Sequence, residues 1–246
     1  MGQIVRINAD GLHYRDLNEQ IHRELKAGHR RFVLENVRGQ RYIGAGLPEG
    51  VEITIKGVAG NDLGAFMNGA RVVVEGNAQD GVGNTMNDGR IVVKGDAGDI
   101  AGYAMRGGQI FIKGNVGYRT GIHMKAYEDH FPFVVVGGVA QDYLGEYMAG
   151  GYLVVLNLAG APRAVGYFTG TGMHGGQILI RGKVEDFQVG KEVGFAEVDE
   201  AEWPMIKRML EEFFSECGVK PLELNPGEFI KLYPKSTRPY GNLYSY

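Results

Sequence analysis

The chain has 246 residues, of which 40 are glycine, 8 are proline and 44% are apolar. Glycine exceeds twice its usual share of about 7%, but the low proline content and ordinary apolar fraction exclude collagen and a disordered low-complexity chain, and indicate a fold with many tight corners. The formal net charge of −3 gives no basic footprint for nucleic acid, so that class of function is set aside.

The N-terminal part contains one predicted helix, from about Tyr14 to Ala27. Its apolar residues recur at helical spacing, and Gly28 suits its end. Residues 31–46 then read as a strand and a corner that begin a repeat. We therefore treat residues 1–46 as an N-terminal helix and capping strand, which would shield the open edge of the first coil.

Seven strand-like runs recur through residues 51–182, each with period-2 alternation and each ending in a closing residue. The closing residues are Gly57, Gly76, Gly95, Gly114, Gly138, Asn157 and Gly182. They are 19 residues apart, except for steps of 24 and 25 that indicate insertions. One slot, ten residues further on, holds Met67, Met86, Met105, Met124, Met148 and, after the last insertion, Met173. The repeat predicts a stack of about seven 19-residue coils with parallel strands, a β-solenoid spanning residues 47–194.

The alternation gives each strand an inner and an outer set of side chains. The predicted inner pairs run from Ile53 and Ile55 to Ile178 and Ile180. The methionine slot also reads as an interior stack, because core packing explains its spacing fully and no cysteine or histidine shares it, as a soft-metal site would need. A third slot, two residues after each closing residue, is small and apolar: Ala59, Ala78, Ala97, Val116, Ala140, Ala159 and Val184.

The outer set is unusual because it forms an apolar row on a face that is normally solvated. The row consists of Thr54, Val73, Val92, Phe111, Val135, Val154 and Leu179. Parallel sheets with two apolar faces are covered on both, so either a terminal helix of this chain or a partner protein should cover it. Val73, Val92, Phe111, Val135 and Val154 are therefore candidate interface residues.

The first insertion, residues 125–130, groups Glu128, Asp129 and His130, with His123 nearby in sequence. Such a cluster can bind a divalent cation or serve acid–base chemistry, but we favour a solvated loop that faces a partner. The second insertion, around residues 161–167, carries no catalytic signature. Four aspartates recur at similar places in their coils, and we expect them to bond their own backbone at corners: Asp62, Asp80, Asp99 and Asp142.

Residues 195–246 form a predicted C-terminal helix and an extended tail. The helix runs from about Asp199 to Cys217; Asp199 and Glu202 resemble a capping box, and Gly218 suits the end. It is the best internal candidate to cover the apolar row. The tail, residues 231–246, shows no helix or strand pattern. Its tyrosines, including the candidate interface residues Tyr240 and Tyr244, would lie against the chain's own body or against a partner.

Enzyme motifs are few. Residues 170–175, GTGMHG, satisfy G-x-G-x-x-G only formally, because no amphipathic helix follows, and His174 reads as a hydrogen-bonded structural residue. The single cysteine, Cys217, is expected to pack in the helix face and not to act as a nucleophile. One cysteine, no signal-peptide pattern and no long apolar stretch favour a cytoplasmic location. We predict no catalytic residue and no cofactor site in this chain.

The glycine pattern resembles a known family. The runs GNAQDGVGNTMNDGRIVVKG, GDAGDIAGYAMRGGQIFIKG and GEYMAGGYLVVL, within residues 44–182, are similar to the GXGXG domain at the C-terminus of the glutamate synthase large subunit and to a related polypeptide of formylmethanofuran dehydrogenase. The resemblance implies a right-handed parallel β-helix with a structural role. FMN and the iron–sulfur cluster would belong to partner subunits.

Three functions follow from this resemblance and from the repeat. The first is a non-catalytic scaffold in a glutamate-synthase-like oxidoreductase, with an amidotransferase and an FMN-dependent synthase subunit as partners; a homo-oligomer is also open. The second is the same role in a formylmethanofuran-dehydrogenase-like complex. The third is an autonomous β-helix enzyme such as a polysaccharide lyase, which the absent signal peptide disfavours. A left-handed acyltransferase solenoid is disfavoured because its coil would have 18 residues.

Overall fold

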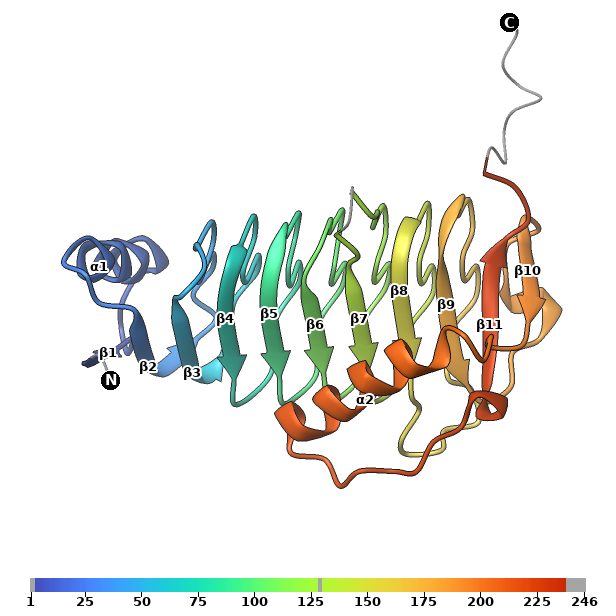
Figure 1. The fold of residues 1–246 in the computed structure, drawn as a ribbon. Helices are drawn as coiled ribbons and strands as arrows, with labels where there is room; N and C mark the ends of the chain where they lie inside the picture. The colour runs from blue at the N-terminus through green and yellow to red at the C-terminus, as the bar shows by residue number, and fades with distance from the viewer. Residues whose placement is uncertain (1–2, 128–129, 238–246) are drawn as a thin grey trace, which may run out of the picture.

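The computed structural model describes residues 3–127 and 130–237, which form mostly sheet with two α-helices (Figure 1). The described strands form one 11-stranded sheet in the order β1-β2-β3-β4-β5-β6-β7-β8-β9-β11-β10. The elements are β1 Ile4–Asn8, α1 Tyr14–Lys26, β2 Arg31–Arg38, β3 Glu52–Val58, β4 Asn68–Val74, β5 Asp88–Val93, β6 Gln109–Ile112, β7 Phe133–Val136, β8 Ala149–Val155, β9 Gly175–Arg181, β10 Val193–Ala196, α2 Trp203–Cys217 and β11 Phe229–Pro234, with short 3-10 turns at Asp186–Gln188 and Pro226–Glu228.

The seven predicted strands are β3–β9, and they are parallel and in the predicted register. Ile53 pairs with Val72, Val72 with Ile91, and Ile91 with Ile110. The insertions leave the register intact, since Gln109 pairs with Phe133 across the first. The seven strands bound about six complete turns, slightly fewer than the seven coils predicted. In Figure 1 the strands run down the side that carries α2 while the chain advances from blue to red, which is a right-handed wind.

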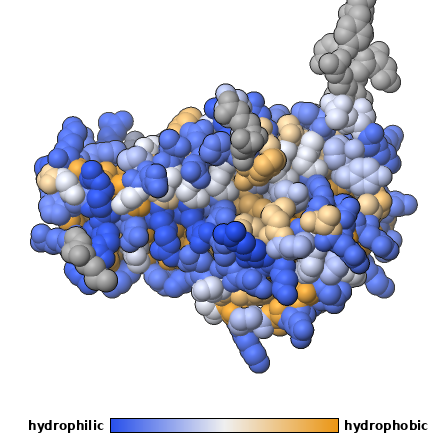
Figure 2. All heavy atoms as spheres, viewed as in Figure 1, coloured by the Kyte–Doolittle hydropathy of each residue, from blue (hydrophilic) through white to orange (hydrophobic). Residues whose placement is uncertain are grey.

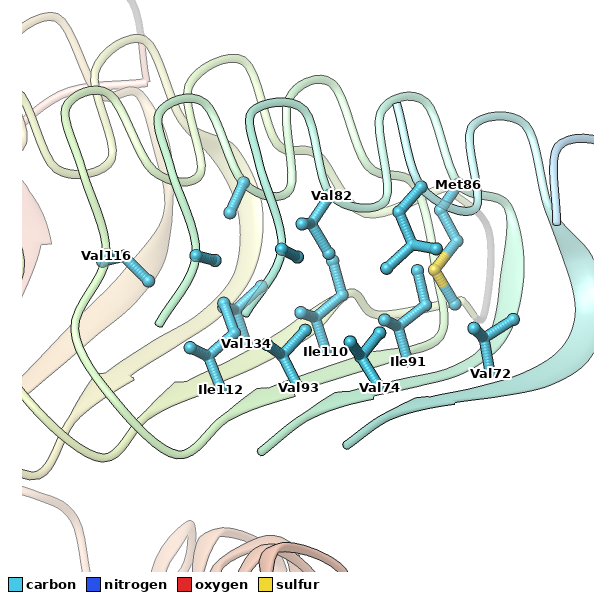
Figure 3. Close-up of a cluster of buried hydrophobic side chains, with 14 of the residues drawn as sticks. Val72, Val74, Val82, Met86, Ile91, Val93, Ile110, Ile112, Val116 and Val134 are labelled. Atoms are coloured by element: carbon cyan, nitrogen blue, oxygen red, sulfur yellow. The ribbon is translucent and has the colours of Figure 1, made fainter. Parts of the chain in front are cut away.

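The core fills the inside of the coils, as predicted. The inner strand residues and all six methionines of the slot are buried, the methionines with no exposed surface. Side chains such as Val82, from the turn across the coil, point toward strand residues such as Ile110 (Figure 3). The third slot is also interior, with one correction. Ala140 pairs with Val165 and not with Ala159, because the second insertion precedes the slot.

Two ladders of Asp and Asn side chains join successive coils. Asn77, Asp96 and Asn115 accept from the backbone N–H of Asp96, Asn115 and Val139, at 3.0, 2.7 and 3.0 Å. Asp80, Asp99 and Asp142 accept from the N–H of Asp99, Tyr118 and Tyr167, at 2.9, 2.8 and 2.8 Å. The prediction that corner aspartates bond their own backbone is therefore wrong for these three; Asp62 accepts from the Asn84 side chain at 2.8 Å.

The first ladder also explains three closing glycines. A Cβ atom added at Gly95, Gly114 or Gly138 would collide with the side-chain oxygen of the ladder residue one coil earlier. Glycine is needed at these positions because the neighbouring coil occupies the space of its side chain.

We expect Asp99→Ala to lower the free energy of unfolding by about 1–3 kcal/mol, because the Tyr118 N–H loses a charged acceptor. Asp99→Asn keeps an acceptor oxygen and should cost less than half as much. Urea unfolding of both variants measures the difference. Equal losses would show that the hydrogen bond is not what the carboxylate contributes.

Both ends of the column are closed by terminal segments. At the N-terminal end, α1 packs Leu17 and Ile21 into the core, as predicted, and β1 adds an edge strand that was not predicted. At the C-terminal end, β11 pairs antiparallel with β9, and β10 pairs with β11. The expectation of no strand in the tail is thus wrong for residues 231–234. Tyr240 and Tyr244 lie outside the described residues.

The helix α2 crosses the outer face of the sheet and covers the apolar row (Figure 1). The row from Val73 to Leu179 shares one buried cluster with Ile206, Leu210, Phe213 and Phe214 of α2. Val73, Val92, Phe111, Val135 and Val154 are therefore packed under the chain's own helix, and they are not a free surface for a partner. Thr54 lies outside this cluster.

The ends of α2 differ in how well they were predicted. Gly218 ends the helix in the left-handed conformation, as predicted, with φ 60°. The capping box is wrong. Glu202 occupies the N-cap without a side-chain cap bond, and the Asp199 carboxylate accepts from the Ala201 N–H at 2.8 Å.

Candidate functional site

A groove of about 710 Å³ lies between the starts of strands β4–β8 and one side of α2. Its floor includes the rings of Phe133 and Tyr152, stacked with centroids 5.4 Å apart and planes 22° apart. Met205 and Met209 of α2 form one wall, and Phe131 of the first insertion stands at the rim with 59% of its surface exposed. We call this the α2 groove; a pale apolar patch lies in this part of the face in Figure 2.

The burial of Tyr152 changes its acidity. Desolvation, together with the charge of Glu202, raises the pKa of the Tyr152 hydroxyl above its ordinary value. The phenol is therefore a neutral hydrogen-bonding group in the groove at physiological pH.

Ion pairs hold α2 beside the groove. Arg90 donates to Glu216 at 2.9 Å, to Gln109 at 2.6 Å and, by its other terminal nitrogen, to Glu212. Arg71 donates to the second oxygen of Glu216 at 2.5 Å. These contacts neutralise the two arginines that line the groove. At the other end of α2, the Glu202 carboxylate accepts from Lys231 at 2.9 Å and from Gln177 at 2.5 Å.

Glu216 makes the attachment of α2 dependent on pH. Burial pushes its pKa upward, but the hydrogen bonds and charges of Arg71 and Arg90 outweigh burial and lower the pKa below its ordinary value. A carboxylate whose pKa is lower in the folded state stabilises the fold above its unfolded-state pKa of about 4.3, and this contribution is lost as the pH falls through the folded-state value.

We therefore expect Glu216→Gln to cost about 1 kcal/mol at pH 7, a small value because the pair is partly solvated. The difference between wild type and variant should shrink as the pH falls from about 5 to 3. Urea unfolding at each pH measures it. A difference that stays constant with pH would contradict the assignment.

A second hollow, of about 420 Å³, adjoins the groove. It is lined by residues that precede successive strands at 19-residue spacing, Asn68, Asn87, Arg106 and Lys125, and by Tyr127 and His130. His130 and no other lining residue belongs to both cavities. Arg106 and Lys125 are exposed and form no salt bridge within the described part of the chain. We call this the basic hollow.

The structure distributes the predicted polar cluster of the first insertion. His130 lies between the two cavities, and Glu128 and Asp129 are outside the described residues. His123 instead stacks on Tyr147, with centroids 5.3 Å apart and planes 10° apart. Among the residues that the structure describes, no three His, Cys, Asp or Glu side chains are grouped so that they could hold a metal ion.

The opposite side of the column carries an aromatic surface, the turn face. Its residues lie in the turns between each closing residue and the methionine slot, across the core from the strands. Exposed aromatic side chains there include Tyr42, Phe66, Tyr103, Tyr118, Tyr167 and Phe168, at 36–58% exposure. Tyr143 and Phe168 stack at 4.9 Å, and Arg119 lies over the Tyr143 ring at 4.8 Å.

Bulky residues occupy strained backbone positions on this face. The residues with φ between 52° and 63° include Tyr42, Phe66, Ile100, Arg119, His123, Tyr143, Tyr147 and Phe168. A left-handed conformation costs a residue other than glycine about 1–2 kcal/mol, and large side chains rarely adopt it. The equivalent corner of another coil carries Gly81, with φ 74°. The fold thus accepts glycine where it mostly carries large side chains.

The remaining predicted residues have structural places. Cys217 is buried under α2, and burial raises the pKa of its thiol to about 12, so it is a poor nucleophile as predicted. The His174 ring lies 3.2 Å from the Gly172 carbonyl oxygen, as a hydrogen-bonded structural residue should. The segment GTGMHG leads into β9 and not into a helix.

The sequence reasoning missed both cavities, although a signal for each exists. The groove residues Arg71, Arg90, Gln109, Phe133 and Tyr152 each stand two positions before a member of the apolar row. They therefore share the outer face, and the strand alternation alone would have placed them together. The basic hollow is visible as a fourth 19-residue series.

The comparisons with known proteins agree with this fold. The family described as GXGXG motif matches residues 20–225. A protein of Methanocaldococcus jannaschii, named only as the uncharacterized protein MJ1350, is 46% identical over 252 residues, which cover 98% of this chain and 96% of that protein. Within residues 3–127 and 130–237, neither α-helix has the length and apolar character needed to cross a membrane.

Proposed function

Because the chain belongs to the GXGXG motif family, we propose that it is a non-catalytic structural subunit of a glutamate-synthase-like oxidoreductase. It would brace an amidotransferase subunit against an FMN-dependent synthase subunit, in the cytoplasm. FMN and the iron–sulfur cluster would be carried by those partners, and this chain would contribute to glutamate biosynthesis by holding them in place.

The turn face is the observation that supports this role most directly. Bulky side chains with left-handed backbone are strained, and such strain is kept where a function needs it. Exposed Tyr, Phe and Arg are also the side chains that protein interfaces favour. With strands about 4.8 Å apart, the six turns give a face roughly 29 Å long, which is compatible with a standard interface of about 800 Å² per partner.

Co-purification from the native cell tests the proposal. A tagged full-length chain should retain an amidotransferase and an FMN-containing subunit at constant stoichiometry, identified by mass spectrometry and flavin absorbance. Phe66→Asp with Phe168→Asp should release at least one of them, whereas Lys183→Glu should not. A chain that always purifies alone, a molybdopterin-containing partner, or glutamate synthesis by the isolated chain would each overturn the proposal.

A further inference from the structure

We propose that the α2 groove and the basic hollow together bind an extended acidic segment of a partner subunit. The segment would place an apolar or aromatic side chain in the groove and a carboxylate against Arg106 and Lys125. The identity of this partner rests on the proposed function, but the chemistry of the segment does not. This surface lies on the α2 side of the column, across the core from the turn face.

The first insertion indicates that the groove is a built feature. The solenoid needs only 19 residues per coil, and the coil between β6 and β7 has 24. The added residues are where the two cavities meet, because His130 lines both and Phe131 lines the groove. Loops inserted into a regular scaffold commonly carry binding function.

The groove suits apolar side chains that arrive from outside. Phe131 and Met205 line it with 59% and 38% of their surfaces exposed, so the chain's own residues leave them largely uncovered. Met205 and Met209 can adapt to the shape of an incoming group, and the Phe133–Tyr152 pair offers a flat aromatic floor. The groove therefore provides a place for an anchor residue of the kind that dominates binding energy.

The charges favour an acidic segment. Glu212 and Glu216 already neutralise Arg71 and Arg90, and Asp88 accepts from the Gly89 N–H at 2.7 Å. Arg106 and Lys125, which form no salt bridge with any described residue, remain to attract a carboxylate. A segment rich in lysine or arginine would be repelled, which gives selectivity.

The dimensions favour a polypeptide over a small molecule. The lining residues of the hollow are mostly exposed, so the hollow does not enclose a ligand as small-molecule sites do. From β4 to β8 there are four strand spacings of about 4.8 Å, or roughly 19 Å, which about six extended residues span at about 3.3 Å each.

Selection from a random 12-residue peptide library, displayed on phage and panned on the immobilised full chain, tests the inference. We expect a consensus with an aromatic or large aliphatic residue and at least one Asp or Glu. A fluorescein-labelled consensus peptide would then be titrated by fluorescence polarisation. Met205→Glu, and Arg106→Glu with Lys125→Glu, should each weaken binding about tenfold or more. The matched charge reversals Lys183→Glu and Lys220→Glu, at exposed sites outside both cavities, should change it less than twofold.

Several results would overturn the inference. These are the absence of a consensus, a basic consensus, or binding that the groove and hollow variants leave unchanged. A dimer of the chain that Met205→Glu dissociates would replace the partner segment by a second copy. Because panning needs no native partner, specific binding would uphold the groove even if co-purification failed, and co-purification unaffected by these variants would leave the scaffold role standing without the groove.

Discussion

Replacing Gly57 by alanine is expected to cost at least about 3 kcal/mol of unfolding free energy, the largest effect of any single methyl group added to the column. Gly57 has φ 132°, and its added Cβ would collide with the carbonyl oxygen of Val37 on the neighbouring strand. Val37 and Gly57 pair where the register between β2 and β3 shifts, so the backbone there cannot move away without breaking the ladder. Urea unfolding followed by circular dichroism measures the loss.

Gly182 provides a matched control because it has nearly the same backbone conformation. Its φ is 131°, but the nearest atom to an added Cβ is 3.9 Å away. Gly182→Ala should therefore show only the backbone strain, about 1–2 kcal/mol. The difference between the two variants isolates the close approach of β2. Equal losses would mean that backbone conformation alone explains both glycines.

These two closing glycines show what a repeat can and cannot predict. The 19-residue register predicted β3–β9, the inner residues and the methionine stack, because each coil repeats the same local pattern. It could not distinguish Gly57 from Gly182, since the difference lies in what the adjacent segment places beside them. The same limit applies to the aspartate ladders, where the acceptor's partner is in the next coil and not in its own turn.

The terminal segments were harder to predict because they are not part of the repeat. The β11 segment is short, ends in Pro234 and merges with a tyrosine-rich tail, so its antiparallel pairing with β9 has no local signal. The apolar row was predicted correctly, but the choice between α2 and a partner as its cover depends on a long-range contact. The turn face was missed because sequence rules assign left-handed corners to Gly, Asn and Asp, and not to Tyr or Phe.

Replacing Phe213 by alanine is expected to detach α2 without unfolding the column. Phe213 is fully buried, and its ring packs edge-on against Phe111 with centroids 6.0 Å apart and planes 84° apart. Removing a buried phenylalanine costs about 3–5 kcal/mol. This loss falls on the layer between α2 and the sheet, and the coil core belongs to a separate cluster. The opening of α2 should therefore become far more frequent than the opening of the strands.

Hydrogen exchange measured by mass spectrometry distinguishes these two kinds of opening. In Phe213→Ala, the amides of α2 should exchange at least about a hundredfold faster, and those of β4–β8 should keep most of their protection. Binding of an apolar dye should rise as Phe111 and Val135 become exposed. Arg208→Ala, whose side chain is 76% exposed on the same helix, should change neither signal. If strands and helix lost protection together, α2 would be an integral part of the solenoid, and the α2 groove would then have a wall that cannot move independently of its floor.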